Sequence, residues 1–230
     1  MVKRIKTGIP GLDKVMEGGL VDNSVNLLSG GTGTGKSIFS LQFLFNGAKQ
    51  FNEKGLYISL EEPEESLKAD VEKLGMDFKK VSKNVKFMYM PPYGITNFLD
   101  PLREQIEKFK PDRIVIDSLT ALVMPLEDDF ERKKEIVNII KLLKRLKCTS
   151  ILVSEIPSNG NIDSDSVGGF SRFGIEEFLC DSLIILHYAG IGGESDRAIR
   201  IIKMRQTNHV RGPIPMSIGK SGISVLKTKY

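Results

Sequence analysis

The sequence has no apolar run long enough to cross a membrane, which takes roughly 18 consecutive apolar residues. Its amino-terminal stretch, MVKRIKTGIPG, carries charges that no apolar segment follows, so no secretory signal peptide is expected. The two cysteines, Cys148 and Cys180, lack the CxxC spacing of a metal or redox site. These absences predict a cytoplasmic protein without a membrane span, whose thiols stay reduced and occupy core positions.

An excess of charge of one sign is also missing. The 33 basic and 29 acidic residues leave a formal charge of +4, which is too small to imply a nucleic-acid partner. Hydrophobic residues make up 40% of the 230 residues and charged ones 27%, as is ordinary for a globular protein. No Pro- or Ser-rich linker divides the chain, so we expect a single domain over residues 1–230.

Strand-like apolar runs alternate with helical patterns along most of the sequence. The expected strands span residues 25–29, 56–60, 85–90, 113–117 and 150–153. The expected helices span residues 36–48, 64–74, 98–109 and 130–147. The strands read as continuous apolar runs, which is typical of a parallel sheet buried on both faces. This part of the sequence therefore predicts an α/β fold with a mostly parallel central sheet flanked by helices.

The last quarter of the sequence follows a different pattern. Strand-like runs at 182–188, 198–205, 214–218 and 223–226 are separated by short segments that contain glycine. They indicate antiparallel hairpins added to the sheet edge. A stretch rich in Gly, Ser, Asn and Asp at 158–169 is expected to be a mobile loop.

A phosphate-binding pattern lies between the first expected strand and helix. LLSGGTGTGKSIF contains the P-loop spacing Gly30-x4-Gly35-Lys36-Ser37. Backbone N–H groups of such a loop converge on phosphate oxygens, and glycines permit the dihedral angles and close approach. A glycine-rich turn without a ligand is the alternative, but the strand and helix flanks favour a nucleotide site. The predicted nucleotide-binding residues are Gly31, Thr32, Gly33, Thr34, Gly35, Lys36, Ser37 and Ile38.

Two of the expected ligands of Mg²⁺ can be named. Lys36 is expected to reach the β- and γ-phosphates, and the Ser37 hydroxyl to bind the metal. Asp117 ends the apolar strand RIVID, where a Walker B carboxylate holds Mg²⁺. An Asp at a strand end is more often a helix cap, but a P-loop in the same domain favours the metal role.

Acidic residues follow the strand in YISLEEPEE. Open α/β sheets bind ligands at the carboxyl ends of their strands, so Glu61 or Glu62 could orient and deprotonate the water that attacks the γ-phosphate. Because side chains alternate along a strand, the two are not expected to face the nucleotide equally. Glu64 and Glu65 are assigned to the dipole of the helix that follows.

With these motifs the sequence resembles the KaiC-like branch of the RecA superfamily of ATPases, especially its single-domain archaeal members. TGIPGLDKVMEGGL resembles the N-terminal lead-in of that family, LLSGGTGTGKS its Walker A segment and RIVIDSLT its Walker B segment. LYISLEEPEE resembles its strand with paired catalytic glutamates, and FGIEEFLCDSLIIL and IKMRQTNH resemble its late strands. The resemblance covers nearly the whole chain. It implies a RecA-like P-loop core with ATP between subunits that assemble head to tail, often as a hexameric ring.

The resemblance also assigns individual roles. Glu61 aligns with the single glutamate of other RecA-type enzymes and is the predicted base, with Glu62 as the supporting carboxylate. A K-x-R segment of the family reaches the phosphates of the neighbouring subunit, which carries over to Lys203 and Arg205. A strand's two-residue period places this pair on one face, where it could stabilise transition-state charge in trans. The alternative is a solvated basic pair that protects an edge strand from aggregation.

One departure from the family concerns phosphorylation. The phosphorylating domain of the clock protein has a Ser/Thr pair before the strand equivalent to 182–188, where this sequence has Glu177 and Phe178. We therefore expect no autophosphorylation there. Because the chain holds one ATPase domain in place of a tandem pair, a circadian role is not expected either.

Three functions follow from these observations. The leading hypothesis is an ATPase that hydrolyses ATP with Mg²⁺ at a subunit interface to drive or signal a conformational change. A DNA-binding recombination modulator related to RadA and RecA is less favoured, because its loop at 158–173 contains Asp163 and Asp165 and is not a basic groove. Nor is a helix-hairpin-helix domain expected before the core. The third hypothesis is a slow nucleotide-sensing scaffold, like the accessory ATPase of the archaeal motility filament.

Overall fold

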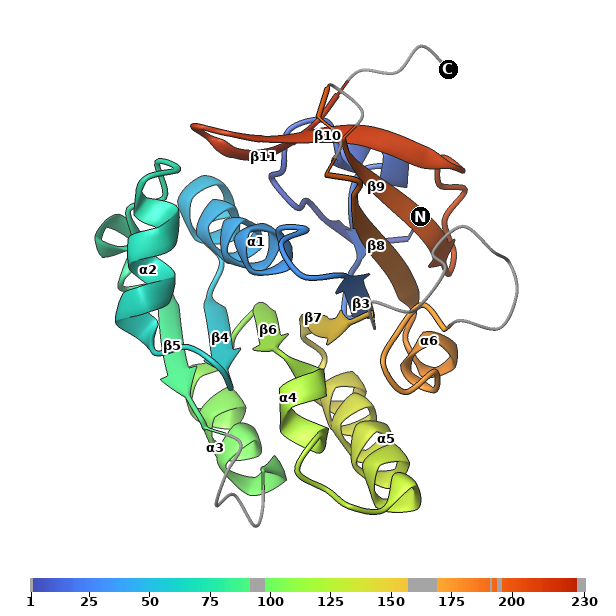
Figure 1. Ribbon diagram of the computed structural model, residues 1–230. Helices are drawn as coiled ribbons and strands as arrows, with labels where there is room; N and C mark the ends of the chain where they lie inside the picture. Colours follow the sequence, from blue (N-terminus) through green and yellow to red (C-terminus); the bar gives the residue numbers. More distant parts are fainter. Residues whose placement is uncertain (1, 92–97, 157–168, 191, 194–195, 227–230) are drawn as a thin grey trace.

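A single large sheet organises the chain in the computed structural model, which describes residues 2–91, 98–156, 169–190, 192–193 and 196–226. Within these residues nine strands lie in the order β11-β10-β9-β8-β3-β7-β6-β4-β5 (Figure 1). The parallel strands are β3 (Val25–Gly30), β4 (Gly55–Ser59), β5 (Val85–Tyr89), β6 (Arg113–Asp117), β7 (Thr149–Glu155) and β8 (Ser182–Tyr188). The antiparallel strands are β9 (Arg197–Met204), β10 (Pro213–Gly219) and β11 (Gly222–Val225). The predicted α/β fold, with antiparallel strands in the C-terminal part of the chain, is confirmed.

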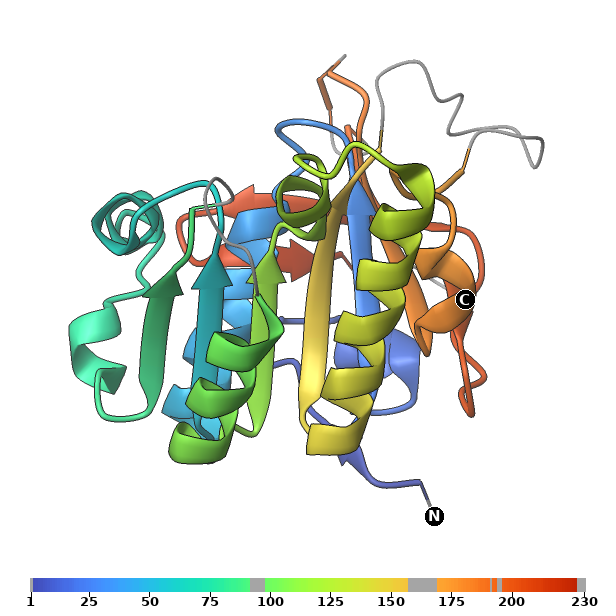
Figure 2. The same ribbon diagram turned by 90° about the horizontal axis from the view of Figure 1, so that it is seen from below.

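Helices cover both faces of the sheet. Helices α1 (Lys36–Phe51) and α2 (Glu64–Glu72) pack on one face, and α3 (Leu99–Phe109) and α5 (Asp129–Leu146) on the other. In Figure 2, α3 and α5 lie in front of the parallel strands. The hairpin of β10 and β11 packs on α1 from above in Figure 1.

The interior follows the sequence pattern. Every residue of β3 and of β4 is buried, because helices cover both sides of these strands. On α5 the buried residues recur at helical spacing, and they are Ile136, Ile139, Ile140, Leu142 and Leu143. This helix begins after Asp128, whose side chain accepts hydrogen bonds from the N–H groups of Phe130 and Glu131.

Several short elements are absent from the sequence prediction. They are β1 (Arg4–Ile5), β2 (Leu20–Val21), the 3₁₀ helices at Asp13–Met16 and Phe78–Val81, α4 (Leu119–Val123) and α6 (Glu176–Leu179). Elements of two to five residues are too short to show a periodicity. The predicted loop at 158–169 lies outside the described residues, apart from residue 169. The same holds for most of residues 158–173, the loop considered for DNA binding.

Candidate nucleotide site at the carboxyl edge of the sheet

The P-loop connects β3 to α1 in a tight turn. Gly33 and Gly35 have φ angles of 73° and 100°, which glycine adopts without strain. A Cβ added to Gly30 would lie 2.6 Å from Oγ1 of Thr34. That hydroxyl donates a 2.9 Å hydrogen bond to the carbonyl oxygen of Gly31 and closes the loop. The predicted phosphate-binding residues thus form one compact turn at the start of α1.

The Lys36 side chain folds back onto this loop. Its Nζ donates to the carbonyl oxygens of Gly30 and Gly31 at 3.0 and 2.9 Å. Burial lowers the pKa of Lys36, and nearby carboxylates oppose that shift. These carboxylates are Glu155, Asp117 and Glu61. The P-loop ammonium is therefore surrounded by negative charge from three separate strand ends.

The paired glutamates point to different neighbours. Oε1 of Glu61 accepts a 2.6 Å hydrogen bond from the Ser118 hydroxyl, which directly follows Asp117. Glu62 instead accepts a 2.8 Å hydrogen bond from Ser66 on α2. Glu61 thus faces the segment after β6 and Glu62 faces the next helix, although both follow β4, which ends at Ser59, so the alternation of a strand does not reach them. Glu64 and Glu65 occupy the first turn of α2, as expected.

Asp117 is held by hydroxyl groups at the end of β6. The Tyr57 hydroxyl donates to its Oδ2 at 2.5 Å, and Ser37 also forms a hydrogen bond with it. Burial raises the pKa of Asp117, and the two hydrogen bonds oppose this shift. The pKa of the Tyr57 phenol is raised well above its ordinary value, mainly by burial. The cap of α4 is Ser118, which accepts from Ala121 N–H, so Asp117 does not have the capping role considered as its alternative.

The end of β7 adds a further carboxylate to the site. Glu155 pairs with Gly30 in the register of β3 and β7, and its N–H donates to the Thr120 hydroxyl at 3.0 Å. No role for Glu155 is predicted from the sequence. Its position beside Lys36 follows from the parallel pairing of β3 and β7.

Arg197 contacts the P-loop from an antiparallel strand. Its Nη1 donates a 2.8 Å hydrogen bond to the carbonyl oxygen of Gly33. Its guanidinium stacks on Tyr188, 3.8 Å from the ring centre. Sequence reasoning missed this contact because the register of β8 and β9, which pairs Tyr188 with Arg197, is set by tertiary structure.

Lys203 and Arg205 lie away from the P-loop of their own chain. Lys203 pairs with Leu183 near the start of β8, whereas Gly30 pairs with Leu186 near its end. Three residues along a strand separate these positions by about 10 Å, in addition to the distance across the intervening strand. The structure therefore does not bring this pair to the nucleotide site of the same chain.

Both basic residues contact the α6 region. Nζ of Lys203 donates to the carbonyl oxygens of Glu177 at 3.0 Å and Cys180 at 2.8 Å. Burial lowers the pKa of Lys203, and the charge of Arg205 adds to that effect. Arg205 pairs with Asp181 at 3.2 Å and keeps 53% of its side chain exposed. Both also donate to the carbonyl oxygen of Phe178, although β9 ends at Met204 and Arg205 follows it.

The oxygen atoms around Asp117 suit Mg²⁺. Among the described residues, no group of three or more His, Cys, Asp or Glu side chains could hold a metal. Mg²⁺ commonly takes one or two protein ligands and completes its shell with phosphate oxygens and water. The Ser37 hydroxyl and the Asp117 carboxylate, which are neighbours, could be two such oxygen ligands.

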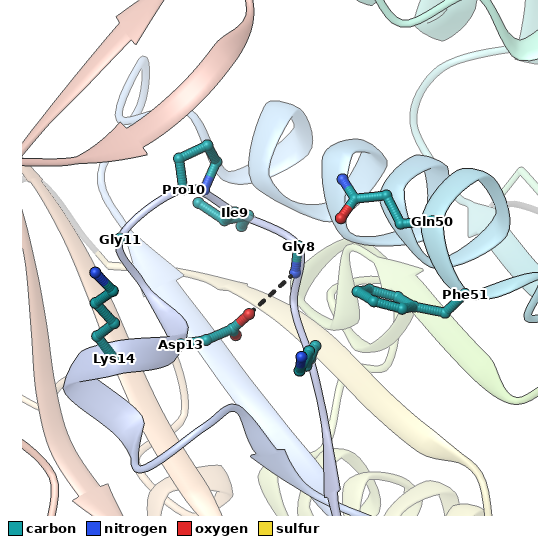
Figure 3. A pocket seen from close by; sticks show the side chains of 9 residues that line it. Gly8, Ile9, Pro10, Gly11, Asp13, Lys14, Gln50 and Phe51 are labelled. Carbon is teal, nitrogen blue, oxygen red and sulfur yellow. Dashed lines mark hydrogen bonds between the residues drawn. The ribbon is translucent and has the colours of Figure 1, made fainter.

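A cavity lies at the far end of α1. It has a volume of about 330 Å³ and is lined by residues that include Ile9, Pro10, Lys14 and Phe51 (Figure 3). The 16 residues of α1 span about 24 Å between this cavity and the P-loop. It is therefore separate from the nucleotide site.

In the part of the chain that the structure describes, no helix combines the length and apolar character that crossing a bilayer requires.

The fold is that of the RecA-like nucleotide-binding proteins, and comparisons with known proteins identify the family. The chain belongs to the KaiC ATPase family, because the model described as "ATPase: KaiC" matches residues 5–230. The crystal structure of the KaiC-like protein PH0186 from Pyrococcus horikoshii OT3 superposes with a TM-score of 0.85 at 32% identity. That match covers 99% of this chain and 100% of the other. The predicted resemblance is confirmed.

Curated relatives agree with this assignment. The UPF0273 protein PF1931 of Pyrococcus furiosus is 35% identical over 250 residues, covering 100% of this chain and 96% of the relative. The circadian clock oscillator protein KaiC of Parasynechococcus marenigrum is 30% identical over 236 residues. That alignment covers 97% of this chain and 45% of KaiC. The chain therefore spans about half the length of the clock proteins that it matches.

Proposed function

We propose that this protein binds ATP with Mg²⁺ at the P-loop and hydrolyses it at a site that a second copy completes. The observation that carries the proposal is the position of Glu61, hydrogen-bonded to Ser118 and close to Lys36 and Asp117. A base, a phosphate-binding lysine and a metal-binding carboxylate thus meet at one sheet edge, as hydrolysis of a γ-phosphate requires.

The P-loop would hold the triphosphate. Residues 31–38 supply backbone N–H groups and the amino terminus of α1, whose dipole favours negative charge. On binding, Lys36 would exchange its contacts with the loop carbonyls for oxygens of the β- and γ-phosphates. Ser37 and Asp117 would hold Mg²⁺, which neutralises phosphate charge when bound.

Glu61 would act as the base. The Ser118 hydroxyl bonds to its Oε1, which leaves Oε2 to orient and deprotonate the attacking water. Glu62 would support this function as a nearby negative charge, because its own carboxylate is turned toward Ser66. The two neighbouring glutamates would therefore contribute unequally to the rate.

A second copy of the chain would supply the remaining positive charge. Lys203 and Arg205 lie toward the opposite end of the sheet from the P-loop, so a head-to-tail neighbour can bring them to the phosphates. Arg205, which is half exposed, would stabilise transition-state charge as an arginine finger does. The partners are then ATP, ADP and further copies, in a ring or an open assembly. A cytoplasmic location suits the two free and buried thiols, Cys148 and Cys180.

Phosphate release from Mg-ATP, measured over a wide range of protein concentration, tests this function. Specific activity should rise by at least about tenfold as the chains assemble, because an isolated chain lacks the finger. Native mass measurement on the same samples reports the assembly. A flat activity profile at a monomeric mass would contradict the shared site, and absence of phosphate release at every concentration would contradict hydrolysis.

A further inference from the structure

Tyr57 is a buried residue whose hydroxyl points at the expected metal ligand. We propose that Tyr57 is a positioning residue that fixes Asp117 as a single-oxygen ligand and thereby sets the Mg²⁺ affinity of the nucleotide site. The inference rests on the proposed function, since it requires the metal at Asp117. The observation behind it is the 2.5 Å hydrogen bond from the Tyr57 hydroxyl to Oδ2 of Asp117.

The Tyr57 ring has little freedom to move away from this contact. It is 0% exposed and belongs to β4, which lies between β5 and β6. Its neighbours in register are Phe87 on β5 and Val115 on β6. The Phe87 ring lies 5.6 Å from the Tyr57 ring, centre to centre. A close-packed interior therefore holds the phenol in one orientation.

The hydrogen bond differentiates the two oxygens of Asp117. A phenol has one proton to donate, and here it is directed to Oδ2. The metal would then bind through the other oxygen, Oδ1, with the Ser37 hydroxyl as a neighbouring ligand. Single-oxygen binding suits Mg²⁺, because its small octahedral shell tolerates little distortion.

Strand β4 also connects this contact to the proposed base. Ser59 lies opposite Asp117 in the pairing of β4 and β6, and Leu60 N–H donates to the Asp117 carbonyl oxygen at 2.8 Å. Glu61 is the next residue along the chain. Tyr57 within β4 and Glu61 two residues after its end are therefore placed by one continuous segment, Tyr57 against the metal ligand and Glu61 against Ser118.

The substitution Tyr57→Phe removes the hydroxyl and keeps the ring. We expect the Mn²⁺ concentration needed for half-saturation, measured by electron paramagnetic resonance with a non-hydrolysable ATP analogue, to rise about tenfold, as for other residues that orient metal ligands. Binding of a fluorescent ATP analogue in EDTA should not change. Tyr89→Phe is the matched control, because Tyr89 ends β5 with 47% of its surface exposed, and it should bind Mn²⁺ like the wild type.

The outcomes separate this inference from the proposed function. Wild-type Mn²⁺ affinity in folded Tyr57→Phe protein would overturn the role of Tyr57 and leave the nucleotide site as proposed. If the wild-type chain binds no Mn²⁺ with the analogue, both proposals fail. Should Tyr57→Phe not fold, fluorine NMR of wild-type protein labelled with 3-fluorotyrosine replaces it. The Tyr57 resonance, identified by substituting the other four tyrosines, should shift when Mg²⁺ joins the bound analogue, and no shift would overturn the inference.

Discussion

Replacing Glu61 with glutamine should lower the rate of ATP hydrolysis by at least about a hundredfold, the usual range for loss of a general base. Glutamine keeps the size of the side chain and an oxygen that accepts the Ser118 hydrogen bond, but it cannot take a proton from water. ATP affinity should stay within about twofold, because the interaction lost belongs to the transition state. Steady-state phosphate release and titration with a fluorescent ATP analogue measure the two quantities.

The matched control is Glu62→Gln, the same change at the neighbouring position. Because the Glu62 carboxylate is turned toward Ser66, we expect a loss of no more than about tenfold. A larger loss for Glu62→Gln than for Glu61→Gln would reverse the two assignments. Full turnover in both variants would show that neither residue is the base.

Arg113→Met should lower the free energy of unfolding by about 3–5 kcal/mol, the usual cost of breaking a buried ion pair. Arg113 is 0% exposed and lies 2.5 Å from the Glu53 carboxylate. Its Nη1 donates to the Phe43 carbonyl oxygen on α1, and its Nη2 donates to the Lys6 carbonyl oxygen in the N-terminal segment. The change leaves Glu53 and two carbonyls without these donors. Urea denaturation followed by circular dichroism gives the free energy.

Two comparison variants make that result specific. Lys133→Met removes a surface ion pair with Asp129 on α5 and should cost less than about 1 kcal/mol. The double change Arg113→Met with Glu53→Met removes both charges and should recover part of the loss. If Arg113→Met is no less stable than Lys133→Met, the buried pair does not hold the N-terminal segment on the core.

The local parts of the site could be predicted from the sequence. Lys36 and Ser37 belong to one contiguous motif, and Glu61 and Asp117 directly follow apolar strands. A parallel sheet aligns the carboxyl ends of its strands, so strand prediction alone places these residues at one edge. The helices on both faces of the sheet follow from the same continuous apolar runs, which need cover on both sides, but the order of the strands does not.

Contacts between side chains on different strands could not be predicted in this way. The hydrogen bond of Tyr57 to Asp117 and that of Arg197 to Gly33 depend on which strands pair and in what register. Arg113 begins a strand, where a sequence pattern treats arginine as exposed, yet carbonyl groups of α1 and of the N-terminal segment enclose it.

The contacts of Lys203 with carbonyl oxygens of α6 and of Cys180 could not be predicted either. Helix α6 has four residues, which is too few for periodicity to reveal. The sequence places Lys203 and Arg205 on one face, but not their distance from the P-loop of the same chain. That distance is what makes a neighbouring copy necessary to the proposed site.

The most direct test of the shared site combines two inactive chains. Lys36→Ala removes the phosphate-binding lysine, and Arg205→Ala removes the proposed finger, so each variant alone should hydrolyse ATP at least about a hundredfold more slowly than the wild type. Co-expression with two different tags and sequential purification isolates the mixed assemblies. In these, a P-loop from the Arg205→Ala chain can meet a finger from the Lys36→Ala chain. When the two variants are mixed equally and occupy positions at random, about a quarter of the interfaces have this arrangement and are intact.

We therefore predict that the mixed assemblies recover roughly a quarter of the wild-type rate of phosphate release. Assemblies of Lys36→Ala with the double variant Lys36→Ala/Arg205→Ala contain no intact interface and should stay inactive. Mixed assemblies no more active than their separate components would contradict the account, because Arg205 would then not act on the nucleotide of its neighbour.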